Sequence, residues 1–410
     1  MNLKSFFYRY LSFILAKSAL LVGKSFIVIL SFNWLSLEDF SKLAVALSIS
    51  EILRGFSDAG AETLVYSRLS SDSSRLSNML TQVMRARIWL ALLVSIISTI
   101  ICYLYFDPNF SIIFLLPFIT AIQNTSFAFL QKQKNFKEIF KLVLFVLIVS
   151  LIAILSSFLW HPHGGILAFL ILAPELFSAI LAFFITRNLW SFITKKIGFS
   201  FKFLIKIRNY LLPSMGVAVL VLLYTRIDAL LVLPLLGHSE QSSYSAAFRF
   251  VEPIFLLFSF ASITLLSELG AKGSADSREY IKSIYTMLNT RLIIVLLLLA
   301  TAAAFVLKAL SMTVFNFTEH SSILVFLMVL VLPIKLTNNF LSTLLQRGAR
   351  FHNVFFATLQ TFLLTYIFGY FFGISLGVKG IIFATFLAEL LNLIHQKFAV
   401  KFMINRYQNS

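Results

Sequence analysis

Residues 40–65 read FSKLAVALSISEILRGFSDAGAETLV, an apolar stretch that is long enough to cross a membrane and carries charges in its middle. These charges are separated by three, four and four residues, which places them on one stripe of a helix: Glu51, Arg54, Asp58 and Glu62. A charged side chain at the centre of a membrane helix costs about 2.5–3.5 kcal/mol on insertion scales, so it indicates a functional role. The stretch therefore predicts a membrane helix with a functional polar stripe.

The composition extends this interpretation to the whole chain of 410 residues. Apolar residues make up 59% of the sequence, charged residues make up 12%, and 46 positions are Phe. A soluble domain of this size cannot bury so much apolar surface, so the bilayer must be the solvent. Cys102 is the one cysteine in the sequence, which excludes an internal disulfide and a cysteine-rich metal site.

Further apolar stretches bring the total to about twelve transmembrane helices and predict an all-α integral membrane protein. They lie near 11–32, 87–106, 110–130, 139–159, 164–187, 209–236, 243–267, 290–309, 321–345, 353–374 and 378–399. The first of them is long enough to span the bilayer and has no small-residue cleavage pattern. We therefore expect a helix there rather than a cleaved signal.

The charges between the stretches predict the orientation of the chain. Basic residues gather in the connections after the even-numbered stretches, where they include Arg75, Arg85, Arg87, Lys132, Lys202, Lys282, Arg347 and Lys401. The connections on the opposite side hold almost nothing basic beyond Lys42 and Lys379. Because basic residues favour the cytoplasmic side, both termini are expected in the cytoplasm. The same bias explains most of the net charge of +17, so we expect no nucleic-acid partner.

A cytoplasmic segment, residues 189–208, divides the chain near its midpoint. Phe and Ile alternate there with Lys and Arg, as in an amphipathic segment on an anionic leaflet, and a solvated linker fits equally well. Six stretches precede this segment and six follow it, which predicts two six-helix lobes, residues 1–188 and 209–410, as parallel repeats around a central cavity. A shift of 201 residues pairs Glu51 with Glu252 across the two halves.

Basic residues within the spans are the candidates for binding an anionic cargo. They are Lys17, Lys24, Arg54, Arg226, Arg249 and Lys335. Prolines 253 and 333 are expected to bend the helices beside Arg249 and Lys335, because proline removes a backbone hydrogen bond. Unpaired cations persist in a bilayer only where water or an anion compensates them. We therefore expect these side chains to line the cavity and to make it positive.

Acidic residues within the spans are the candidates for proton or sodium coupling. They are Asp58, Glu51, Asp228 and Glu252. The alternative is a purely structural role, in which Arg54 pairs with Glu51 or Asp58 on its own helix. In the second half, Asp228 is expected to pair with Arg249 across the seventh and eighth stretches. The sequence leaves both interpretations open.

Other chemical signals are weak. Glu175 and Glu389 stand alone in the sixth and twelfth stretches, as protonated packing residues or as proton carriers. His161 and His163 lie in a turn and do not indicate a metal site. The sequence has no glycine-rich loop that ends in Lys-Ser or Lys-Thr, so ATP hydrolysis by that route is excluded and no cofactor is expected. The extracytoplasmic loops are too short for a catalytic domain, so we do not expect an enzyme.

Three segments at the start of the second half resemble a known family. They are Arg226-Ile-Asp228, Leu236-Gly237 and Tyr244-Ser-Ala-Ala-Phe-Arg249, and they are similar to the matching region of polysaccharide flippases in the multidrug/oligosaccharidyl-lipid/polysaccharide exporter superfamily. Residues 40–60 resemble the corresponding first-half segment. Both places usually carry a glycine where this chain has Ser41 and Ser242. Twelve spans suit O-antigen-type flippases better than fourteen-span lipid II flippases.

The resemblance implies a flippase that moves undecaprenyl-diphosphate-linked oligosaccharide from the cytoplasmic to the periplasmic leaflet of the bacterial inner membrane. Transport would proceed by alternating access, driven by a proton or sodium gradient or by cargo turnover. The diphosphate of the cargo would be the electrostatic partner of the buried cations. Membrane lipids and other polysaccharide-assembly proteins are the further partners that the resemblance implies.

Two alternatives from other classes remain. A cation-coupled multidrug exporter of the same superfamily would share the fold, but its cationic cargo would favour an acidic cavity. A membrane glycan polymerase or ligase would need a longer extracytoplasmic loop or an acidic catalytic motif. The basic residues within the spans therefore favour the flippase.

Overall fold

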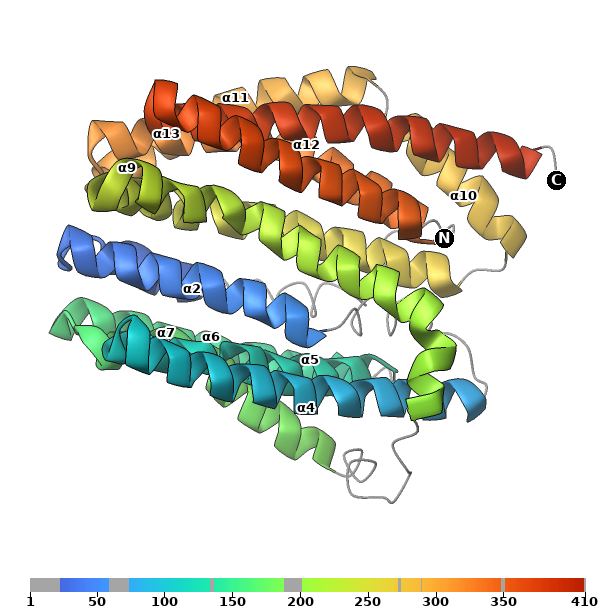
Figure 1. Ribbon diagram of the computed structural model, residues 1–410, viewed down its shortest axis with the longest axis horizontal. Helices are drawn as coiled ribbons and strands as arrows, with labels where there is room; N and C mark the ends of the chain where they lie inside the picture. Colours follow the sequence, from blue (N-terminus) through green and yellow to red (C-terminus); the bar gives the residue numbers. More distant parts are fainter. Residues whose placement is uncertain are drawn as a thin grey trace. The chain divides into compact units, whose positions relative to one another are not determined.

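The computed structural model describes residues 23–58, 74–132, 136–187, 201–271, 274–288, 290–347 and 351–408. Within these ranges the regular structure is helical and contains no strand (Figure 1). The first half forms α2 (Leu37–Asp58), α4 (Ser74–Tyr105), the 3-10 helix η1 (Pro108–Leu115), α5 (Leu116–Lys132), α6 (Phe136–Trp160) and α7 (Gly164–Thr186). The second half forms α9 (Phe201–Ala271), α10 (Ser274–Met287), α11 (Thr290–Thr313), α12 (Glu319–Arg347) and α13 (Phe351–Gln408). Residues 23–31 are also helical.

Two of these helices turn back sharply at a glycine. With 71 and 58 residues, α9 and α13 are far longer than the roughly 20 residues that cross a bilayer. The backbone leaves the helical region at Gly237 (φ 85°, ψ −177°) and at Gly377 (φ 65°, ψ −151°), in conformations that L side chains rarely adopt. Each is therefore a hairpin of two arms. Figure 1 shows the two arms of α9 lying side by side, and an ion pair between Arg226 and Glu252 joins them.

Eight segments of the described chain are long and apolar enough to cross a membrane. They are Met84–Tyr105, Pro108–Phe127, Glu138–Trp160, Gly164–Thr186, Gly216–Phe255, Arg291–Thr313, Glu319–Gln346 and His352–Asn405. The fifth and the last contain the glycine turns, so each holds two crossings. Of the other expected spans, 40–65 falls on α2 and the region beyond it, and most of 11–32 lies outside the described residues. The protein is thus an all-α integral membrane protein, and the expected fold class is confirmed.

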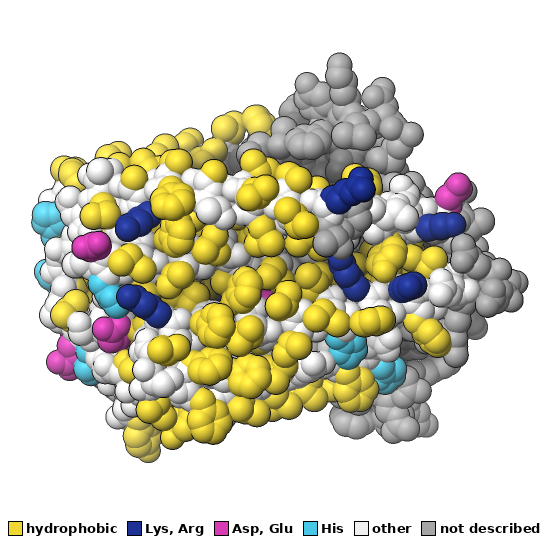
Figure 2. All heavy atoms as spheres, turned by 90° about the horizontal axis from the view of Figure 1, so that it is seen from above, with side chains coloured by type: hydrophobic (Ala, Val, Ile, Leu, Met, Phe, Trp, Pro, Cys, Tyr) yellow, Lys and Arg dark blue, Asp and Glu magenta, His cyan; other side chains and the backbone are white. Residues whose placement is uncertain are grey.

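Large apolar side chains remain on the surface of these helices. Trp89, Leu298 and Phe398 are 59%, 67% and 70% exposed. Figure 2 shows hydrophobic side chains over most of the face in view, with few charged groups between them. Soluble proteins rarely expose so much continuous apolar surface, so this surface is suited to contact with lipid tails.

The contacts of the chain define two compact units. One comprises Met1–Ser31 and Ala46–Val219, and the other comprises Phe32–Val45 and Leu220–Ser410. In the first unit α7 packs against α5 and α6, and in the second α12 packs against α11 and α13. The predicted linker, residues 189–208, lies mostly outside the described residues, and its last part begins α9. The amphipathic α10 follows α9 and was not expected from the sequence.

Candidate functional site

A buried ion cluster in the first unit joins three helical segments. Lys24, in the helical residues 23–31, places its Nζ 2.9 Å from Oε1 of Glu51 on α2 and 3.9 Å from Oε1 of Glu175 on α7. All three side chains are buried. One ammonium group therefore faces two carboxylates.

A second pair in the first unit ties α2 to α4. Asp58 binds Arg87, and the Arg87 side chain is 2% exposed. The sequence placed Arg87 in a cytoplasmic connection, whereas the structure buries it within α4. Arg54 is half-buried on α2. Its expected pairing with Glu51 or Asp58 is not found in the described part of the chain, where these acids bind Lys24 and Arg87.

In the second unit, one carboxylate bridges two arginines. Oε1 of Glu252 binds Nη2 of Arg226, and Oε2 of Glu252 lies 2.7 Å from Nη1 of Arg249. Arg226 comes from the first arm of α9, and the other two residues come from the second arm. The guanidinium carbon of Arg226 lies 4.7 Å from the ring centroid of Phe248. All three charged side chains are buried.

Asp228 therefore has different partners from those that its spacing predicted. It was expected to pair with Arg249, but Arg249 binds Glu252 instead. The carboxylate of Asp228 accepts the backbone N–H of Ala229 at 2.8 Å and contacts the hydroxyl of Tyr244. The spacing explains the difference, because Arg249 and Glu252 are three residues apart and share one face of the helix.

Lys335 on α12 lies farther from its carboxylate partner than the buried cations described above. Its Nζ lies 4.0 Å from Oε1 of Glu389 and 5.6 Å from the ring centroid of Phe255. Glu389 is anchored separately, because Nδ2 of Asn338 donates to its Oε2 at 2.7 Å and to its backbone carbonyl at 2.9 Å. Asn338 lies three residues after Lys335, on the same face of α12. The Lys335 ammonium group is thus available for another partner.

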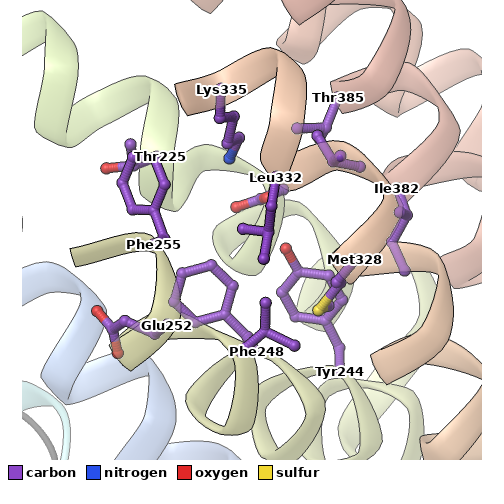
Figure 3. A pocket seen from close by; sticks show the side chains of 13 residues that line it. Thr225, Tyr244, Phe248, Glu252, Phe255, Met328, Leu332, Lys335, Ile382 and Thr385 are labelled. Atoms are coloured by element: carbon purple, nitrogen blue, oxygen red, sulfur yellow. The ribbon is translucent and has the colours of Figure 1, made fainter. Parts of the chain in front are cut away.

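A small cavity in the second unit connects these groups. It has a volume of about 50 Å³, room for a few water molecules, and Asp228, Glu252 and Lys335 line it with apolar and aromatic side chains. Figure 3 shows that the carboxylate of Glu252 points away from the other labelled side chains, while Lys335 extends between the helices. The cavity can admit a small polar group but is too small for an oligosaccharide.

The family model for a polysaccharide biosynthesis protein matches residues 34–296, which is more than half of the chain. The chain belongs to this family. Among curated proteins, none matches the chain in sequence.

Solved transporter structures share the fold of this family member. The eukaryotic MATE transporter AtDTX14 superposes with a TM-score of 0.66 at 14% sequence identity, over 98% of this chain and 97% of that one. The lipid II flippase MurJ, in an inward closed conformation, gives a TM-score of 0.63 at 19% identity, over 95% of this chain and 87% of that one. A MATE protein in the straight conformation gives 0.61 at 12% identity, over 99% and 97%. The resemblance noted from the sequence is confirmed at the level of family and fold.

The structure brings most of the predicted site residues of this family member into clusters within each unit. Lys24 joins Glu51, Asp58 joins Arg87, and Arg226, Arg249 and Glu252 join one another. Lys17 lies outside the described residues. The roles of all these residues stay predictions.

The sequence did not predict the roles of several residues at these clusters. Arg87 ends a basic run before an apolar stretch, which is typical of a cytoplasmic flank, so no local signal distinguished it. Asn338 could have been found, because a spacing of three residues from Lys335 places it on the same helix face. Tyr244 and Phe248 were noted as part of a family segment, but their contacts with Asp228 and Arg226 depend on the turn at Gly237.

Proposed function

We propose that the protein is a flippase that moves undecaprenyl-diphosphate-linked oligosaccharide from the cytoplasmic to the periplasmic leaflet. It would serve the assembly of an O-antigen or capsule-type polysaccharide and act as a transporter rather than an enzyme. The observation that carries this proposal is the buried arginine pair, Arg226 and Arg249, in a chain with this family and fold. Guanidinium groups match the oxygens of phosphates in two-point contacts, and buried cations in a membrane favour an anionic partner.

The proposed binding residues are the basic residues within the spans of both halves. They are Lys17, Lys24, Arg54, Arg226, Arg249 and Lys335. In the second unit Glu252 offsets the charges of Arg226 and Arg249, and Glu389 offsets that of Lys335. Such pairing lets the empty protein keep its charges in the bilayer, and a diphosphate would compete with these internal carboxylates for the same cations.

The proposed energy source is an ion gradient or the turnover of the cargo. Glu51, Asp58, Asp228 and Glu252 are the proposed coupling residues, because Glu51, Asp58 and Glu252 are each bound to a cation and Asp228 lines the cavity together with Lys335. A carboxylate that loses its cation to the cargo can take up a proton or Na⁺ and so link the two movements. Alternating access between inward-open and outward-open states would complete the cycle. We place the protein in the bacterial inner membrane with both termini in the cytoplasm, as the charge bias predicts.

A deletion strain tests the function directly. Loss of the gene should cause a lipid-linked glycan to accumulate on the cytoplasmic leaflet, and expression of the wild-type gene should clear it. The R226Q/R249Q double variant should insert in the membrane at wild-type levels and fail to clear the glycan. Accumulation of no lipid-linked glycan in the deletion strain would contradict the proposal.

A cation-coupled exporter of small cationic compounds is the second candidate. The first-unit cluster favours it, because two buried carboxylates, those of Glu51 and Glu175, lie at one ammonium group. The two candidates differ in cargo charge, so a purified preparation in liposomes separates them. Uptake of a cationic dye that is not inhibited by lipid diphosphate would support the exporter. Movement of a labelled lipid diphosphate would support the flippase.

A further inference from the structure

Glu252 makes contacts of the kind that a phosphate group would make. Each of its two carboxylate oxygens binds a different guanidinium, Oε1 that of Arg226 and Oε2 that of Arg249. Its side chain is 5% exposed, so these contacts are made away from bulk water. A carboxylate bound in this way is an anion with two oxygens in a site formed by two arginines.

The two arginines have supports besides this carboxylate. The guanidinium of Arg226 lies over the ring of Phe248, at 4.7 Å from its centroid, in a cation–π contact. The side chain of Arg249 is 3% exposed and is therefore confined by its neighbours. The turn at Gly237 brings the two arms of α9 together and so places the arginines near each other. The pair is thus positioned to bind a second anion if Glu252 leaves.

We infer that Glu252 is an internal counter-ion that occupies a two-arginine diphosphate site and must leave it when the cargo binds. This inference rests on the proposed function and specifies its binding site. Carboxylate and phosphate oxygens offer guanidinium groups similar two-point geometry, so one anion can replace the other. A diphosphate carries more negative charge than a carboxylate and has a stronger attraction to two buried cations.

The cavity gives the displaced carboxylate a place to go. Glu252 lines it together with Lys335, whose ammonium group can donate hydrogen bonds to a carboxylate. Lys335 is 4.0 Å from Glu389, at the limit for an ion pair, so its ammonium group can bind a second acid. The carboxylate of Glu252 can therefore leave the arginines without becoming an unpaired charge in an apolar environment.

The test measures binding of undecaprenyl diphosphate to the full chain in lipid nanodiscs. The E252Q variant keeps the shape of the side chain and removes its charge, so it should bind this lipid at least tenfold more tightly than the wild type. A tenfold change corresponds to about 1.4 kcal/mol. The E240Q variant is the matched control, because Glu240 lies on the same helix, pairs with His320 at the surface and should leave the affinity unchanged. Inorganic pyrophosphate is included as a competitor, and competition would show that the diphosphate rather than the lipid chain is recognised.

Two further variants test whether the effect of E252Q arises from the loss of the carboxylate at the two arginines. The R249Q/E252Q double variant should lose the gain, because the gain requires both arginines. The E252D variant retains the charge but cannot span both guanidinium groups, so it should bind between the wild type and E252Q, and it covers the case in which E252Q unfolds. Equal or weaker binding by folded E252Q and E252D would overturn the inference and leave the proposed function standing. If neither the wild type nor any variant bound the lipid diphosphate, both would fall.

Discussion

Nζ of Lys24 lies 2.9 Å from Oε1 of Glu51, and the second half repeats this relationship between Arg226 and Glu252. In each half a basic residue binds a buried glutamate that follows it on the next span, 27 residues later in the first and 26 in the second. The two glutamates are the ones that a shift of 201 residues aligned in the sequence. The shared pairing favours descent of the two halves from one duplicated unit.

The pair of Lys24 and Glu51 should contribute to stability because it is buried. Among the described residues, the E51Q variant leaves the ammonium group with one carboxylate, that of Glu175 at 3.9 Å, so it should destabilise the protein by about 3 kcal/mol, at the low end for breaking a buried pair. The pair of Lys42 and Glu38 is exposed, so E38Q is the matched control and should have no measurable effect. Thermal unfolding in detergent measures both, and equal midpoints for the two variants would contradict the prediction.

Reversal of the charge at Lys335 should reduce transport more than tenfold without loss of protein from the membrane. The K335E variant places a second carboxylate beside Glu389 in the second-unit cavity and removes a cation that the cargo is proposed to bind. K379E is the control, because Lys379 is exposed on the same helix as Glu389. The measurement is movement of labelled lipid diphosphate in liposomes. Full transport by K335E would remove Lys335 from the proposed binding residues.

Substitution of Asp58 distinguishes a role in ion coupling from a role in helix packing. The D58N variant should slow export and flatten its dependence on the proton or sodium gradient, because the amide cannot take up the ion. If the pair with Arg87 is only structural, R87Q and D58N should lower stability alike and leave the gradient dependence of the remaining transport unchanged. Transport rates over a series of imposed gradients distinguish the two. A full rate with unchanged gradient dependence in D58N would make Asp58 a packing residue.

The sequence predicted the helices well and their pairings poorly. Span boundaries such as 164–187 agree with α7 at Gly164–Thr186, because a bilayer imposes a minimum apolar length on each helix. Helix phase identified which charged residues share a face, but it contains no information on which neighbour lies opposite. Arg249 was assigned to Asp228 on another span, although Glu252 lies three residues after it on the same helix face, because the sequence does not show which of the two acids is nearer. The burial of Arg87 was missed for the same reason, since its partner Asp58 comes from another helix.

Cysteine labelling tests the proposed orientation with little background. The chain's one cysteine, Cys102, is 2% exposed, so a membrane-impermeant thiol reagent should not reach it in the wild type. A cysteine at Ser239 or Asn109 should be labelled from outside the cell, because both positions are exposed, Asn109 in η1 and Ser239 just after the turn at Gly237, and the charge bias predicts that they lie outside. A cysteine at Ser283, exposed on α10, should be labelled only after the membrane is opened. The reverse pattern would show that the orientation is wrong.

We expect Gly237 to be required because of its backbone conformation and not because a side chain at this position would clash with a neighbour. Its φ of 85° and ψ of −177° lie in a region that essentially only glycine occupies, yet nothing lies within 4 Å of the position that a Cβ would take. The G237A variant should therefore lose about 1–3 kcal/mol of stability through backbone strain alone. G165A is the control, because Gly165 is helical and its added Cβ would meet its nearest neighbour, the carbonyl oxygen of Asn109, at an ordinary 3.6 Å. The turn also holds Arg226 near Glu252, so G237A should weaken binding of the lipid diphosphate, whereas G165A should not. Unchanged thermal unfolding and unchanged binding in G237A would mean that the turn tolerates an L residue and that the arginine pair does not depend on it.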